Sequence, residues 1–218
     1  MDLVEYLGTK KLNELIIENP YNSSGVLDIA AGKHNQRGLG FLGQEFRLSE
    51  KQGLKQSNTT VGTIYSCVVK MVRVQPDFGT VALTDIVVGR PLFWNDTKKF
   101  FVTPLATATA RLAGISLVTM TSANAKGDLI PIVVHGDVGI KMAAAITKAT
   151  VAINDPIVLS IASSLATVDV LADATGWTNV QLALRVGKML TAIGTGGDGT
   201  VVKCYLDNAD RIYNDGVM

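Results

Sequence analysis

The chain has few of the residues that build most metal and nucleophilic sites. Among its 218 residues are two cysteines, Cys67 and Cys204, and two histidines, His34 and His135. Neither pair is close in sequence and no Cys-x-x-Cys occurs, so the ligand spacing of a structural zinc site is missing. We therefore expect two buried, reduced thiols, no catalytic residues, and neither a metal nor another cofactor.

Long uncharged runs are also missing, although 47% of the residues are hydrophobic and the mean hydropathy is +0.28. Charged residues interrupt each apolar stretch before it reaches ~18 residues, which argues against a transmembrane helix. The first residues do not show the basic-then-apolar pattern of a secretory signal. A net charge of +1 disfavours nucleic acid as the main partner. An apolar chain with only 18% charged residues is expected to bury surface against other proteins.

Glutamate is missing from most of the chain, since all five glutamates lie within the first 50 residues. Beyond them the sequence becomes rich in Thr, Val, Ala, Ile and Gly, which favour strands and turns. We predict an N-terminal helix followed by an extended arm over residues 1–60, and a mainly β body after it. The glycine-rich stretch 23–50 is either an ordinary surface loop or an arm that becomes ordered on a partner.

Short apolar segments bounded by Gly, Pro, Asp and Asn follow one another through the body. This pattern is typical of a β-barrel or a β-sandwich. The predicted strands are Thr63–Val74, Thr80–Val88, Leu129–His135, Ile157–Ile161 and Val201–Leu206.

Three signatures occur twice in the same order along the body. They are a turn with a proline that leads into an apolar strand, an apolar-glycine-apolar strand, and a Gly-Asp turn. The first copy has Pro91, Gly114 and Gly127-Asp128, and the second has Pro156, Gly187 and Gly197-Asp198. The repeat predicts two tandem β modules, over residues 61–140 and 141–218.

This order of turns and strands resembles the small capsid cement (head decoration) proteins of tailed bacteriophages. The second copy departs from the pattern, because it lacks the aromatic strand that holds Phe93 and Trp94 in the first copy and because it inserts Leu171 to Thr178. The resemblance covers roughly residues 80–207 and rests on Gly89, Pro91, Trp94, Asn95, Asp96, Gly114, Gly127 and Asp128.

The resemblance implies a non-enzymatic structural virion protein. Proteins of this family bind the outer surface of the phage head, often as trimers, and stabilise contacts between major capsid subunits. The expected location is the capsid exterior, after synthesis in the host bacterial cytoplasm, with no direct nucleic acid or membrane partner. Alternative interpretations are a head fibre base or a tail structural protein and, with less support, a major capsid protein or a carbohydrate-binding β protein.

Candidate interface residues come from the predicted helix and arm and from the two tryptophans, since Trp is favoured in interface hot spots. Core packing is the alternative reading of each aromatic residue. These candidates are Leu3, Leu7, Arg37, Phe41, Phe46, Trp94 and Trp177.

Two further patterns have ordinary structural readings. The Asn95-Asp96 and Asn154-Asp155 pairs are typical of β-turns and lack the spacing of a calcium loop. His135 could act as a base near Asp137, but a surface or capped histidine is the simpler interpretation.

Overall fold

A computed structural model describes the β body of the chain. The described residues are 43, 45–50, 65–74, 81–95, 100–106, 111–121, 127–160, 165–170, 185–194, 199–207 and 209. The predicted N-terminal helix and most of the predicted arm lie outside them. The strands are β1 (Glu45–Leu48), β2 (Cys67–Val74), β3 (Pro91–Trp94), β4 (Phe101–Thr103), β5 (Leu112–Ser116), β6 (Leu129–Lys141), β7 (Pro156–Ser160), β8 (Thr167–Val170), β9 (Arg185–Met189) and β10 (Val201–Leu206).

Five strands form a closed barrel, which we call barrel 1. Its order is β2-β4-β3-β5-β6, and pairing of β6 with β2 closes the circle. The β2–β4 pair is parallel and the other pairs are antiparallel. The structure thus confirms the prediction of a mainly β chain with a barrel body.

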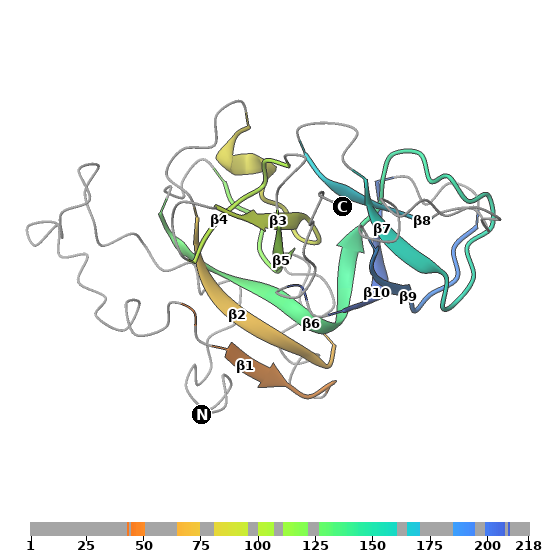
Figure 1. The fold of residues 1–218 in the computed structure, drawn as a ribbon, viewed down its shortest axis with the longest axis horizontal. Helices are drawn as coiled ribbons and strands as arrows, with labels where there is room; N and C mark the ends of the chain where they lie inside the picture. Colours follow the sequence, from red (N-terminus) through yellow and green to blue (C-terminus); the bar gives the residue numbers. More distant parts are fainter. Residues whose placement is uncertain are drawn as a thin grey trace, which may run out of the picture.

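A second set of strands repeats this arrangement, and we call it ring 2. Its order is β6-β10-β9-β7-β8, and a parallel bridge between Met142 and Val168 joins β8 to the end of β6. The 13-residue strand β6 belongs to both units: its first half pairs with β2 and β5, and its second half pairs with β10. In Figure 1, β6 runs from barrel 1 to the strands of ring 2.

Strand register is the same at matching places in the two units. Leu92 lies opposite Gly114 in barrel 1, and Ile157 lies opposite Gly187 in ring 2. A β-bulge directly follows each of these pairs, at Leu92/Phe93 and at Ile157/Val158. The proline signature and the apolar-glycine-apolar signature therefore occupy matching places in matching strands.

The turn before the first strand of each matched pair is also the same. Gly89 and Asn154 both have left-handed backbones, with φ of 81° and 72°. The Gly89 N–H donates to the Ser116 carbonyl, and the Asn154 N–H donates to that of Met189, both at 2.9 Å. Asparagine is among the few non-glycine residues that tolerate this conformation, so the turn survives a change of sequence.

The third signature needs a correction, because the sequence match was displaced by two residues. Ile132 and Cys204 hold matching places in β6 and β10, opposite Ser116 and Met189. Following each strand back to its start therefore matches Gly127 with Gly199. Both glycines have positive φ; Gly127 donates its N–H to the Val74 carbonyl at the end of β2, and Gly199 donates to that of Ala143, two residues beyond the end of β6.

The predicted strand Thr80–Val88 is wrong for its described part. Residues 83–85 form a 3₁₀ turn, η2 (Leu83–Asp85), instead of a strand. The Asp85 carboxylate accepts a hydrogen bond of 2.7 Å from the Ala82 N–H, and the Asp85 N–H donates back to the Ala82 carbonyl. This local bonding competes with sheet pairing, although the surrounding residues are apolar.

Apolar side chains fill the inside of both units. In barrel 1 the inward residues are Val72, Val74, Leu92, Val102, Ala113, Ile130, Ile132 and Val134. The matching residues of ring 2 are Ile140, Met142, Ile157, Val168, Val186, Val202, Cys204 and Leu206. All of them are buried, so each unit has a packed core and no open lumen.

Candidate functional site

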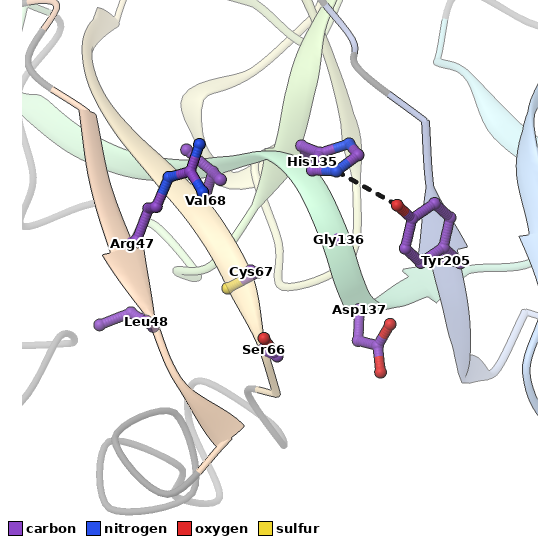
Figure 2. A pocket seen from close by; sticks show the side chains of 9 residues that line it. All are labelled: Arg47, Leu48, Ser66, Cys67, Val68, His135, Gly136, Asp137 and Tyr205. Carbon is purple, nitrogen blue, oxygen red and sulfur yellow. Dashed lines mark hydrogen bonds between the residues drawn. The ribbon is translucent and has the colours of Figure 1, made fainter.

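A pocket of about 290 Å³ opens where β1, β2, β6 and β10 meet. This is the place where barrel 1 passes into ring 2 along β6. Its walls combine charged, aromatic and sulfur-containing side chains, shown in Figure 2. They are Arg47, Leu48, Ser66, Cys67, Val68, His135, Gly136, Asp137 and Tyr205.

A histidine and a tyrosine on neighbouring strands form one wall of the pocket. The Tyr205 hydroxyl lies 3.1 Å from Nε2 of His135, and the two rings meet edge to face with centroids 5.4 Å apart. Nδ1 of His135 is buried and has no hydrogen-bond partner among the residues that the structure describes. Figure 2 shows the two side chains reaching toward one another from β6 and β10.

A salt bridge lies beside this pair, on the same side of the sheet. The Asp137 carboxylate is 3.5 Å from Nζ of Lys203, and both side chains are about one-quarter exposed. The Lys203 ammonium also lies 3.7 Å from the centroid of the Tyr65 ring. Asp137 is therefore paired with a lysine, and the hydrogen-bonding partner of His135 is Tyr205.

The two thiols are buried and free, as predicted. Burial, with a smaller contribution from the negative charge of Asp137, raises the pKa of Cys67 to about 12. Burial raises the pKa of Cys204 to about 12 as well, and its Sγ lies 3.6 Å from Sδ of Met189. Both thiols are protonated at neutral pH, so neither is an activated nucleophile.

Two cations complete the surroundings of the pocket. Arg47, on β1, is exposed at the rim. Nζ of Lys188, on β9, lies 5.9 Å from the centroid of the Tyr205 ring. The pocket thus continues into a wider polar surface on the outside of ring 2.

Only two of the predicted interface residues lie within the described part of the chain. Trp94 ends β3 and is half-buried, with its ring 6.4 Å from that of Phe100 and 5.6 Å from Nζ of Lys70. Phe46 lies in β1 opposite Val69. Trp94 is not among the pocket-lining residues. Leu3, Leu7, Arg37, Phe41 and Trp177 lie outside the described residues.

The Asn154-Asp155 turn is held by its own contacts, as a structural turn would be. The Asp155 carboxylate accepts a 2.7 Å hydrogen bond from the Ala152 N–H and lies 2.8 Å from Nζ of Lys148. Within the described ranges no group of three or more His, Cys, Asp or Glu side chains is placed to hold a metal ion. The Asp96 half of the other predicted turn pair lies outside those ranges.

No family model and no curated protein matches this chain. Within the described segments, no helix is long and apolar enough to cross a membrane. The geometry of the β body therefore carries the functional argument.

Sequence reasoning missed the cluster around Tyr205, although a signal was present. From residue 135 to 141 and again from 201 to 206, polar residues largely alternate with apolar ones. Such alternation is typical of a strand with one buried face and one solvent face. It identifies the outward side chains, but it does not reveal that β6 and β10 are neighbours.

Proposed function

We propose that this chain is a capsid cement protein, a structural virion component that binds the outer surface of a phage head. The observation that carries the proposal is where the residues of the resemblance lie. Gly89 forms the left-handed turn, Pro91 begins β3, Gly114 lies against β6, and Gly127 forms the turn before β6. The shared residues are therefore those that shape the module.

The packed interiors support a role that depends on surface contact. Because apolar side chains fill both units, the loops and the solvent-facing surface of ring 2 are the parts available for binding. Burial of apolar area contributes about 25 cal/mol per Å², so a modest contact at each site stabilises its neighbours. Repetition of that contact over a shell multiplies the effect on the particle.

The proposed partner is the major capsid protein, with the chain clamping adjacent subunits from outside. By the same resemblance we propose a trimer, without direct contact to nucleic acid or membrane. Measuring the solution mass of the purified chain by light scattering tests this assembly. A strict monomer at high concentration would contradict the trimer.

Purified heads with and without this protein test the proposal directly. We expect heads that lack it to release DNA at a lower temperature and at lower ionic stress, and added protein to restore their resistance. An equal concentration of an unrelated β-protein serves as the control. Heads that are equally robust without the protein would overturn the cement function.

Locating the chain on the particle separates this function from its nearest alternative. A cement protein occupies sites across the whole shell, whereas a fibre base or a tail component occupies a few sites. Electron cryomicroscopy of the assembled particle distinguishes the two patterns.

A further inference from the structure

The two copies of the module differ most on their outer faces. Arg73 of β2, the counterpart of Lys141, is an outward cation of barrel 1 and is buried. The other outward positions of β2, β5 and the first half of β6 are mostly apolar and buried. These residues are Cys67, Val69, Met71, Leu112, Ile115, Leu129 and Val133, each at most 5% exposed.

Most of the matching positions in ring 2 carry polar or charged side chains. Ile115 pairs with Val133 in barrel 1, and their counterparts Lys188 and Tyr205 pair in ring 2. We call this outward surface of β6, β9 and β10 the ring 2 face. It consists of His135, Asp137, Lys141, Arg185, Lys188, Lys203 and Tyr205, all of them half-buried or exposed.

Burial explains why the barrel 1 positions are apolar. They belong to the same buried cluster as the interior of ring 2. The ring 2 face is not covered in this way, because its residues are half-buried or exposed. Cations gathered on such a solvent-facing sheet surface point to an acidic partner.

The ring 2 face is positively charged, although residues 151–218, which supply most of it, carry more acidic than basic residues. Residues 151–218 hold four basic and seven acidic residues, yet Arg185, Lys188 and Lys203 all lie on this face. With Lys141 the face has four cations against one carboxylate, Asp137, and Asp207 follows at the end of β10. The basic residues are therefore gathered on one surface.

Neighbouring aromatic rings hold two of these cations in place. Lys203 lies over the Tyr65 ring and Lys188 over the Tyr205 ring. The Tyr205 hydroxyl is in turn bonded to His135. Cations positioned on rigid strands lose less side-chain entropy when a partner binds. Tyrosine and arginine, here Tyr205 and Arg185, are also enriched at protein interfaces.

We propose that the ring 2 face docks onto an acidic protein surface. The identity of that surface as the outside of the capsid subunits rests on the proposed function, whereas its acidic character rests on the face itself. A protein partner fits better than nucleic acid, because the whole chain has a net charge of only +1. Complementary charge of this kind sets orientation and the rate of association.

Two single charge reversals that change the charge by the same amount test the proposal, with binding to purified phage heads as the measurement. Lys188→Glu alters the face, and Arg111→Glu alters an exposed cation outside the face, beside β5. We expect binding of Lys188→Glu to weaken at least tenfold and that of Arg111→Glu to stay within twofold of wild type. Thermal unfolding checks that both variants fold. If Lys188→Glu does not fold, the double variant Arg185→Gln/Lys188→Gln replaces it.

The outcomes separate the two proposals. If Lys188→Glu binds heads as tightly as wild type does, the docking face is overturned and the cement function stands. If wild type does not bind heads, the cement function is overturned. Binding to an immobilised 20-residue polyglutamate peptide then tests whether the ring 2 face binds an acidic partner. We expect wild type to bind this peptide and Lys188→Glu to lose that binding. The docking proposal would be refuted if both proteins bind the peptide equally, if wild type does not bind it, or if wild type binds a 20-base-pair DNA duplex more tightly than the peptide.

Discussion

Gly187 in β9 lies directly against the backbone carbonyl of Tyr205 in β10, and a Cβ on residue 187 would fall well inside 3.0 Å of that oxygen. Gly114 stands in the same relation to the carbonyl of Val133 in barrel 1. Each glycine thus lets two strands approach at the matched place in the two copies. The close approach explains why the apolar-glycine-apolar signature occurs in both.

Replacing either glycine by alanine is expected to destabilise the chain. The added methyl group meets backbone, which cannot rotate away, so the strands must separate locally. We expect Gly187→Ala and Gly114→Ala each to lower the free energy of unfolding by roughly 1–3 kcal/mol, measured by chemical denaturation.

Gly194→Ala is the matched control, because no atom of the described residues lies within 4 Å of a Cβ built there. It should leave the free energy of unfolding nearly unchanged. Loss of stability in Gly194→Ala equal to that in Gly187→Ala would show that flexibility, and not strand approach, decides these positions.

Asn154 offers a second test of the duplication, because it occupies the left-handed position that Gly89 holds in barrel 1. Asn154→Gly should keep or slightly raise stability, whereas Asn154→Val should lower it by about 1–2 kcal/mol, since a β-branched residue is strained there. Thermal unfolding of the two variants measures the difference. If valine is tolerated as well as glycine, the turn does not need its left-handed residue.

The strands and the duplication could largely be predicted from the sequence, because both leave local marks. Pro91 and Pro156 mark the start of matching strands, and Val201–Leu206 was predicted at its observed bounds. Such marks arise from turn chemistry and from apolar runs, which depend on neighbouring residues.

Features that depend on contacts between distant segments could not be predicted. The register of Met189 against Cys204 decides which glycine matches Gly127, and sequence spacing alone chose the wrong one. The cluster of His135 and Tyr205 needs β6 and β10 to be adjacent, although the two residues are 70 positions apart. The Asp85 turn was missed because one side-chain bond outweighs an apolar run.

The buried thiols predict slow modification in the folded chain. At pH 8, Cys67 and Cys204 should react with a maleimide far more slowly in the native protein than in denaturant, because burial raises the pKa of both to about 12. Mass spectrometry of timed samples measures the labelling. Fast labelling of either thiol without denaturant would contradict its buried position.

The same raised pKa values predict a loss of stability in alkali. An unfolded thiol ionises from about pH 8.5, whereas the folded thiols hold their protons to about pH 12. The folded chain therefore binds more protons across this window, and its free energy of unfolding should fall as the pH rises from about 8.5 to 12. A Cys67→Ala/Cys204→Ala variant should show a smaller decline over the same range, and an identical decline would exclude the thiols as its cause.

Asp155 predicts the opposite dependence at low pH. Burial opposes ionisation of its carboxyl group, but the hydrogen bond from Lys148, the Ala152 N–H and the charge of Lys148 together lower its pKa. The stabilising contribution is therefore present at neutral pH and is lost as the pH falls below about 4. Asp155→Asn should lower the free energy of unfolding by about 1–2 kcal/mol at pH 7, because Lys148 loses the charged hydrogen bond to the Asp155 carboxylate in a half-buried place. The difference between the variant and wild type should shrink in acid, measured by denaturation at pH 7 and pH 3. Asp169→Asn is the comparison, because it removes a carboxylate that bonds Thr147 and leaves the Lys148–Asp155 pair in place. If the two variants respond alike, the Lys148–Asp155 pair is not the source of the acid dependence.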